Sequence, residues 1–180
     1  MHSCIKSVKI LLYGQQKEVL WRYDIKVAIL TANTQVYKEQ EEDKGGKVIR
    51  KIVEEAGQHV IFAKALPVDK KVLSTVMQRM ADGNMADIIL TTGGAGCAAG
   101  DVTPEATTEI LDRPVPGIPE AIRMHLMHLT KRSMLNRGVA GFRGNTLIVN
   151  LPGKAGAAKE SLEYILPEIV HAAELGQKEN

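Results

Sequence analysis

Aromatic residues are scarce in this chain: phenylalanine, tryptophan and tyrosine make up 4% of its 180 residues. The chain is long enough for a full hydrophobic core, which must therefore be built mainly from valine, isoleucine, leucine, alanine and methionine. Cysteine is also rare, with only Cys4 and Cys97, and their spacing offers neither a disulfide framework nor a zinc motif. We therefore expect a reduced, cytoplasmic setting.

Long apolar runs and a strong charge of one sign are lacking as well. The longest apolar runs, in "DIILTT" and "TLIVNL", are far too short to span a bilayer, and "MHSCIKSVKI" contains no apolar signal-peptide core. The 23 basic and 21 acidic residues give a formal net charge of +2, which provides no electrostatic footprint for nucleic acid or an anionic membrane. We expect a soluble cytoplasmic protein that binds neither.

Apolar runs and helical periodicity alternate along most of the chain. Continuous apolar runs predict buried strands, and spacing of three to four residues between apolar positions predicts helices. The expected strands span 25–30, 59–67, 86–92 and 145–153, and the expected helices span 47–57, 70–82, 104–111, 119–130 and 155–176. Asp69 is expected to cap the helix that Gly83 ends. This alternation predicts an α/β fold, a three-layer α/β/α sandwich with a mostly parallel sheet.

The N-terminal segment has a different pattern. "SVKILLYGQQKEVLWRYD" contains two short apolar runs around a polar turn at Gly14–Lys17, a pattern typical of a hairpin. We therefore expect residues 1–24 to form a short β-hairpin extension and residues 25–180 to form the main domain.

Three expected strands end in small or polar residues: "AILTAN", "ILTTGGAG" and "IVNLPG". In open α/β sheets ligands bind beyond the carboxyl ends of the strands. We therefore expect these three strand ends to meet at a ligand site.

The glycine-rich stretch "TTGGAGCAAGDVTPEAT" carries the clearest chemical signal. Gly93, Gly94 and Gly96 can bring backbone amides close to an anion, although the stretch lacks a Walker motif and a tight turn is an alternative interpretation. Asp101 beside an anion site suggests Mg²⁺, and helix capping is the alternative. After the last strand, Asn150 offers hydrogen bonds and the helix that follows Gly153 offers an N-terminus for an anion, although an ordinary strand–helix connection is again possible.

Several segments together resemble a known family. "ILTTGGAG", "DVTPEAT", "PGIPEA", "GVAGFRGNTLIVNLPG" and "ILPEIVHA" are similar to the MogA/MoaB type of molybdenum-cofactor biosynthesis protein, whose domain also occurs in gephyrin, over roughly residues 25–175. The resemblance implies a fold of the molybdopterin-binding type, homotrimers or hexamers, and binding of molybdopterin, a pterin with a dithiolene and a terminal phosphate. It also implies ATP as co-substrate and Mg²⁺ as cofactor, because active members transfer AMP from Mg-ATP onto that phosphate.

The resemblance also implies roles for individual residues. Asp101 matches one of two carboxylates thought essential for transfer, and it is the implied metal ligand. Val68 occupies the position of the second carboxylate, so Asp69 is the only acid near that position and the second candidate catalytic residue. Substrate binding is implied for the matching residues Thr92, Gly93, Gly94, Gly96, Thr103, Pro104, Glu105, Asn150, Pro152 and Gly153.

The departures from the family pattern affect residues that the family uses for AMP transfer. Val68 replaces an acid, Ala95 replaces the usual threonine, and Gly100 replaces the usual arginine. The resemblance is therefore compatible with a molybdopterin adenylyltransferase, with a non-catalytic molybdopterin or nucleotide carrier or regulatory paralogue, and with a structural oligomer that has lost ligand binding.

Overall fold

The computed structural model describes residues 8–13, 16–21 and 24–177. Strands β1 (Val8–Tyr13) and β2 (Gln16–Trp21) pair in antiparallel register from Val8 opposite Trp21 to Tyr13 opposite Gln16. The expected polar turn at Gly14–Lys17 is too wide, because Gln16 and Lys17 belong to β2, while residues 14–15 lie outside the described residues. The division of the chain at residue 24 stays a prediction.

A six-stranded sheet forms the centre of the fold, in the order β4-β3-β5-β8-β7-β6. Four strands run parallel: β3 (Lys26–Ala32), β4 (His59–Leu66), β5 (Ile88–Thr92) and β8 (Thr146–Leu151). Every residue of β5 and β8 is buried. Their continuous apolar sequences therefore reflect helices on both faces of the sheet.

Two short strands extend the sheet beyond β8 in antiparallel pairing, β7 (Ala140–Arg143) and β6 (Arg113–Pro114). Neither is predicted from the sequence, because two to four residues are too few to show a period. The sheet is thus mostly parallel with an antiparallel edge, a common arrangement in mixed sheets.

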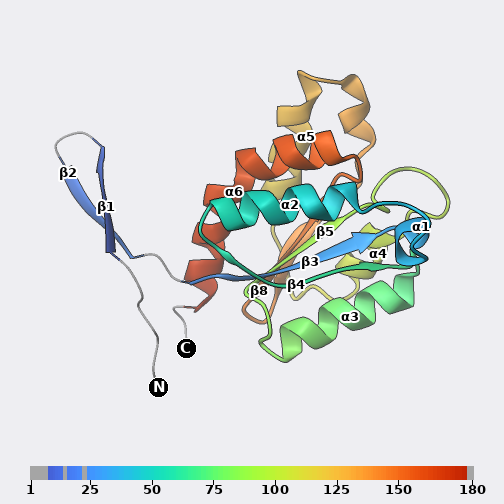
Figure 1. Ribbon diagram of the computed structural model, residues 1–180, viewed down its shortest axis with the longest axis horizontal. Coiled ribbons are helices and arrows are strands. Elements are labelled where there is room, and N and C mark those ends of the chain that lie inside the picture. The colour runs from blue at the N-terminus through green and yellow to red at the C-terminus, as the bar shows by residue number, and fades with distance from the viewer. Residues whose placement is uncertain (1–7, 14–15, 22–23, 178–180) are drawn as a thin grey trace.

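Helices cover both faces of the sheet, as Figure 1 shows. On one face α2 (Lys44–Glu55), α5 (Gly117–Met127) and α6 (Ala155–Gln177) pack on the sheet through a core that includes Val53, Ile122 and Leu162. On the other face α3 (Lys70–Asp82) and α4 (Thr103–Thr108) pack through a second core around Leu73 and Met77. The predicted three-layer α/β/α sandwich is confirmed.

Local signals account for the helix ends. Asp69 caps α3, since its carboxylate accepts a hydrogen bond from the Val72 amide at 2.9 Å, and Gly83 ends that helix as predicted. Helix α2 begins three residues earlier than its predicted start at 47, because the Asp43 carboxylate caps it by accepting from the Gly46 amide at 2.7 Å. The short helix α1 (Thr34–Tyr37) and the 3-10 helix η1 (Lys131–Leu135) are too brief to predict from periodicity.

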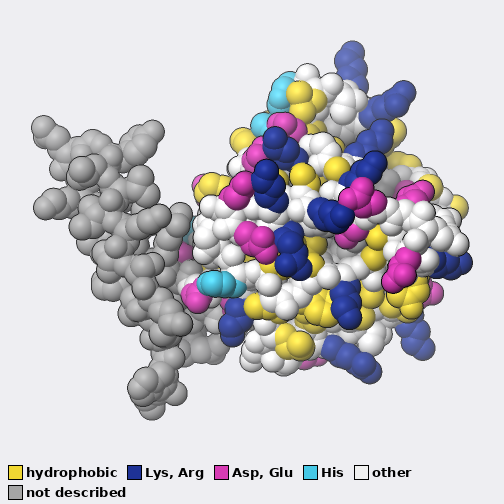
Figure 2. All heavy atoms as spheres, in the orientation of Figure 1, with side chains coloured by type: hydrophobic (Ala, Val, Ile, Leu, Met, Phe, Trp, Pro, Cys, Tyr) yellow, Lys and Arg dark blue, Asp and Glu magenta, His cyan; other side chains and the backbone are white. Residues whose placement is uncertain are grey.

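Basic and acidic side chains intermingle on the molecular face that Figure 2 shows. Along α2 they form pairs at helical spacing, Arg50 with Glu54 and Lys51 with Glu55. This mixing agrees with the small net charge of the chain. Within residues 24–177, no helix has the length and apolar character needed to cross a membrane.

Candidate functional site

The carboxyl ends of β3, β5 and β8 lie side by side in the sheet. Thr31 is opposite Thr92, and Thr92 is opposite Leu151. A cavity of about 550 Å³ opens beyond these ends, as expected from the sequence. It is bordered by the starts of α2 and α6 and by the segment before α3. Its lining residues are Thr31, Ala32, Asn33, Val36, Glu41, Glu42, Asp43, Lys44, Gly45, Val68, Thr92, Gly93, Gly94, Asp101, Gly153, Lys154 and Ala155.

Gly93 and Gly94 form the turn that directly follows β5, and both have positive φ angles, 95° and 61°. A Cβ atom at Gly93 would lie 2.4 Å from the Ala32 carbonyl oxygen, and one at Gly94 would lie 2.4 Å from Thr103 Oγ1. Only glycine satisfies both the backbone conformation and the close approach. The turn therefore brings main chain directly to the cavity wall.

Two buried threonines hold this turn in place. The Thr92 hydroxyl donates to the Pro152 carbonyl at 2.7 Å, which joins the ends of β5 and β8. The Thr103 hydroxyl donates to the Gly93 carbonyl at 2.9 Å, and the Thr103 amide donates to the Gly94 carbonyl at 2.9 Å. Thr92 and Thr103 thus use their hydroxyl protons inside the protein, and Thr103 is not among the residues that line the cavity.

Asp101 borders the cavity from the far end of the glycine-rich loop. Its Oδ2 atom accepts a hydrogen bond from the Ala98 amide at 2.9 Å, while Oδ1 accepts none from the residues that the structure describes. Over the described part of the chain, no three His, Cys, Asp or Glu side chains cluster as a metal site. One free carboxylate oxygen nevertheless fits Mg²⁺, which proteins commonly hold through one or two carboxylates together with substrate phosphates.

The second expected carboxylate position is filled by an apolar side chain. Val68 lines the cavity, and its amide donates to Thr34 Oγ1 at 3.0 Å, which fixes the chain just before α3. Asp69 is exposed, its carboxylate is engaged in capping α3, and it is not among the lining residues. The structure thus brings Val68 to the cavity wall beside Gly94 and keeps Asp69 at the helix end.

Asn150, a candidate for substrate binding, lies in the core with 1% of its surface exposed. Its amide nitrogen donates to the hydroxyls of Thr91 and Thr107, each at 2.9 Å, and its amide oxygen accepts from the Val139 amide at 3.2 Å. The side chain therefore links β5, β8, α4 and the start of β7, and it is not among the residues that line the cavity.

Replacing Asn150 with leucine is expected to lower the free energy of unfolding by about 3 kcal/mol, because a buried amide loses three hydrogen bonds and leaves its partners unpaired. Urea denaturation measures this change. Asn145→Leu, in the turn between β7 and β8, is the control and should alter stability by less than about 1 kcal/mol. A loss of similar size for both variants would contradict the role assigned to the Asn150 network.

Pro104 and Glu105 open helix α4, and neither is among the residues that line the cavity. The Glu105 carboxylate pairs with Arg137, whose hydrogen bond holds the pKa of Glu105 below its ordinary value of 4.5. Because the pKa of Glu105 is lower in the folded state, the pair with Arg137 stabilises the fold at neutral pH. This stabilisation is lost as the pH falls below 4.5 and through the lowered pKa of Glu105.

The cavity wall carries two lysines and the N-terminus of α6 as groups that can bind an anion. Helices α2 and α6 begin at the cavity wall, and Lys44 and Lys154 lie at these two starts. Helix N-termini attract anions through their free amides and their dipoles. Glu42 pairs with Lys47, with 2.6 Å between Oε1 and Nζ, and the Asp43 carboxylate caps the start of α2. The other acids on the wall are Glu41 and Asp101. The cavity thus combines anion-binding elements with the free carboxylate oxygen of Asp101.

A second cavity of about 490 Å³ adjoins the first and shares Gly153 and Lys154 with it. Gly96 and Pro152 line this neighbour, together with Cys97, Leu126 and Leu135. Of the expected site residues, Thr92, Gly93, Gly94, Asp101 and Gly153 line the larger cavity, and Gly96, Pro152 and Gly153 line the smaller one.

The loop after β3 also lines the cavity. Its run "KEQEEDKGG" carries Asp43 and Gly45, which resemble a family loop near the pterin site, and both residues are on the cavity wall. Val36 and Glu41 line the cavity, and they follow the expected strand end "AILTAN". The strand end itself was the available signal.

Comparisons with known proteins agree with this arrangement. Residues 28–171 match the family described as a probable molybdopterin binding domain. The molybdenum cofactor synthesis protein cinnamon of Drosophila melanogaster is 34% identical over 152 residues, which is 84% of this chain but only 25% of cinnamon. The molybdopterin adenylyltransferase of Helicobacter pylori strain 26695 is 31% identical over 153 residues, covering 84% of this chain and 87% of that protein.

Solved structures give the same result. The molybdopterin biosynthesis enzyme MoaB from Thermus thermophilus superimposes with a TM-score of 0.79 at 40% identity, covering 84% of this chain and 96% of that one. The family match over residues 28–171 includes the glycine-rich turn and the end of β8. This chain belongs to the family of probable molybdopterin-binding domains of molybdenum-cofactor biosynthesis.

Proposed function

We propose that this protein binds molybdopterin in the cavity at the ends of β3, β5 and β8 and acts in molybdenum-cofactor biosynthesis. The observation that carries the proposal is the convergence of the α6 N-terminus and the Gly93–Gly94 turn on one cavity. A terminal phosphate is a suitable ligand for such free amides. The adjoining apolar cavity, which shares Gly153, suits the ring end of the same ligand.

ATP and Mg²⁺ are proposed as further ligands of the larger cavity. Lys44 and Lys154 can pair with phosphate oxygens, and the free Asp101 oxygen can take one coordination position of Mg²⁺. A bound Mg²⁺ would offset charge on a transferring phosphoryl group. The chain's own contribution is to orient the phosphates and to hold the metal beside them.

Of the two carboxylates in the family pattern, this chain has only Asp101, and this difference determines what we propose about catalysis. Because Val68 lines the wall where the family pattern has its second acid, AMP transfer from Mg-ATP should be strongly reduced, and we propose a molybdopterin carrier with weak or no transferase activity. An active molybdopterin adenylyltransferase is the second candidate. It is favoured by the free oxygen of Asp101 and by the similarity to the Helicobacter pylori enzyme.

One experiment tests both candidates. The protein is incubated with molybdopterin, ATP and Mg²⁺, and bound ligand and adenylated product are measured beside the Helicobacter pylori enzyme. We expect molybdopterin to bind and product to form at about 1% or less of that enzyme's rate. A rate equal to that enzyme's would favour the second candidate, and failure to bind molybdopterin would overturn the proposed function.

Asp101→Asn is the variant for this experiment. Its amide oxygen can still accept from the Ala98 amide, so the loop is kept while the charge is removed. We expect the affinity for Mg-ATP to fall about tenfold and molybdopterin binding to be retained, since the phosphate-binding amides are unchanged. Isothermal titration with each ligand measures both, and unchanged Mg-ATP affinity would contradict the metal role of Asp101.

The proposal extends to assembly and location. A homotrimer or hexamer in the cytoplasm is proposed, supported by a set of exposed apolar side chains along and just after α5: Met124, Met127, Leu129, Met134 and Leu135. Exposed apolar side chains gathered on one surface are typical of protein interfaces. Light scattering of the purified protein measures its mass, and a monomer at micromolar concentration would contradict the assembly.

A further inference from the structure

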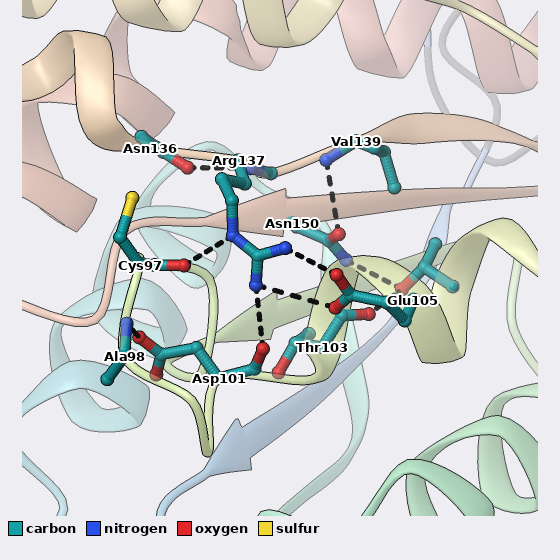
Figure 3. A network of polar contacts seen from close by, with 12 residues as sticks. Cys97, Ala98, Asp101, Thr103, Glu105, Asn136, Arg137, Val139 and Asn150 are labelled. Carbon is teal, nitrogen blue, oxygen red and sulfur yellow. Dashed lines mark hydrogen bonds and ion pairs between the residues drawn. The ribbon is translucent and has the colours of Figure 1, made fainter.

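Arg137 lies between η1 and β7 and lines neither of the two cavities described above, yet it contacts the loop that carries Asp101 (Figure 3). Its Nε atom donates to the Gly96 carbonyl at 2.6 Å, and its Nη2 atom donates to the Asp101 carbonyl at 2.7 Å. Its Nη1 atom pairs with the Glu105 carboxylate. One guanidinium thus joins both ends of the loop 96–101 to the first turn of α4.

The loop has few other contacts that fix its shape. Residues 97–100 are exposed, so the loop gains little from core packing. Within it, the Asp101 amide donates to the Ala98 carbonyl at 2.9 Å, and the Ala98 amide donates back to the Asp101 carboxylate. These local bonds close a turn. The Cys97 thiol also donates to the Leu135 carbonyl at 3.2 Å, and the two bonds from the Arg137 guanidinium hold both ends of the turn against the rest of the protein.

Arg137 is itself held on a rigid segment. Its amide donates to the Ala95 carbonyl at 2.9 Å. On either side of it, the carbonyls of Asn136 and Gly138 both accept from Arg123 Nη1 at 3.2 Å, so helix α5 fixes the segment. A planar guanidinium with donors in fixed directions can then impose the spacing of the groups that it binds.

We propose that Arg137 is a positioning residue, which fixes the loop 96–101 and thereby holds the Asp101 carboxylate at the cavity wall. The effect on the loop follows from the contacts of Arg137 alone. The consequence for ligands rests on the proposed function, because it requires that Asp101 meet Mg-ATP in the cavity.

Amide hydrogen exchange tests the effect on the loop. In Arg137→Gln, the amides of Ala98 and Asp101 should exchange about tenfold faster than in the wild type, because the loop loses the two bonds that the guanidinium makes to its ends. Arg137→Lys should restore little of the protection, since one ammonium group cannot reach two carbonyls and a carboxylate together.

Arg143→Gln is the matched control. Arg143 also pairs in bidentate fashion with a carboxylate, that of Asp82, and also donates to a backbone carbonyl, that of Ile110 at 2.9 Å. Its removal should leave exchange in residues 95–102 unchanged. Equal exchange of the loop in Arg137→Gln and in the wild type would overturn the proposal, as would equal acceleration in both variants.

The ligand measurement separates positioning from general stability. In Arg137→Gln we expect Mg-ATP affinity to fall about tenfold, close to the loss in Asp101→Asn, and molybdopterin affinity to change by less than about threefold. An equal loss of affinity for both ligands would point to a merely structural role and overturn the assignment. If the wild type binds neither ligand, the proposed function fails, and the exchange comparison still decides whether Arg137 fixes the loop.

Discussion

Replacing Val68 with aspartate is expected to raise the rate of Mg²⁺-dependent AMP transfer to molybdopterin by at least about 100-fold. Val68 lines the same cavity as Asp101, so the new carboxylate would be a second acid at that cavity. Two carboxylates and the ligand phosphates form a better Mg²⁺ site than one. The backbone should tolerate the change, because the hydrogen bond that fixes it runs from the Val68 backbone amide to Thr34 Oγ1 and does not involve the Val68 side chain.

The control for this variant is Val68→Asn, because asparagine has nearly the same shape as aspartate but carries no charge. It should leave the transfer rate within about threefold of the wild type. Asp69→Ala serves as a second control, because it removes the cap of α3 and should cost about 1 kcal/mol of stability without changing the rate per folded molecule. If Val68→Asp and Val68→Asn have the same rate, the missing carboxylate does not limit the chemistry.

A second substitution should add to the first. At Gly100 a Cβ atom would meet no heavy atom within 4 Å beyond its chain neighbours, so the position has room for the start of a side chain. Val68→Asp combined with Gly100→Arg restores both the acid and the arginine of the family pattern. The same assay should give a higher rate for the double variant than for Val68→Asp alone.

Replacing Gly93 with alanine is expected to lower the free energy of unfolding by about 3 kcal/mol and to weaken molybdopterin binding more than tenfold. The Gly93 φ angle of 95° is unfavourable for a side chain, and the new Cβ atom would lie 2.4 Å from the Ala32 carbonyl. The ends of β3 and β5 would have to separate, which would move the cavity floor. Urea denaturation and titration with molybdopterin measure the two effects.

Gly156→Ala makes the same chemical change where the structure has room. Gly156 lies in the first turn of α6, and beyond its chain neighbours and the backbone of its own helix no heavy atom lies within 4 Å of its Cβ position. This variant should be neutral or more stable by up to about 1 kcal/mol, because alanine favours the helix. A Gly93→Ala variant as stable as Gly156→Ala, with normal binding, would refute the proposed function of the turn.

Much of this fold could be predicted because its signals are local. The strands β3, β5 and β8 are buried on both faces and read as unbroken apolar runs, and Asp69 and Gly83 mark the ends of α3. The predicted starts of α2 and α5, at residues 47 and 119, differ from the observed starts at Lys44 and Gly117. Asp43 caps α2 in front of two glycines, a sequence that shows no helical period.

The site was less predictable, because the groups that a side chain contacts are often distant in the sequence. Asn150 is next to the end of β8, but strand alternation turns it into the core toward Thr91 and Thr107. Arg137 is 41 residues from Gly96 in the sequence, and only the folded chain brings it to the loop. Glycine positions and strand ends could therefore locate the cavity, while the contacts that shape its wall could not be inferred.

The central claim is that the cavity at the ends of β3, β5 and β8 holds molybdopterin. Hydrogen exchange of the wild-type protein with and without saturating molybdopterin tests it most directly. We predict slower exchange in residues 92–101 and 153–158, which form the turn after β5 and the start of α6. Molybdopterin binding that leaves both segments unchanged, or slows exchange elsewhere only, would contradict the account.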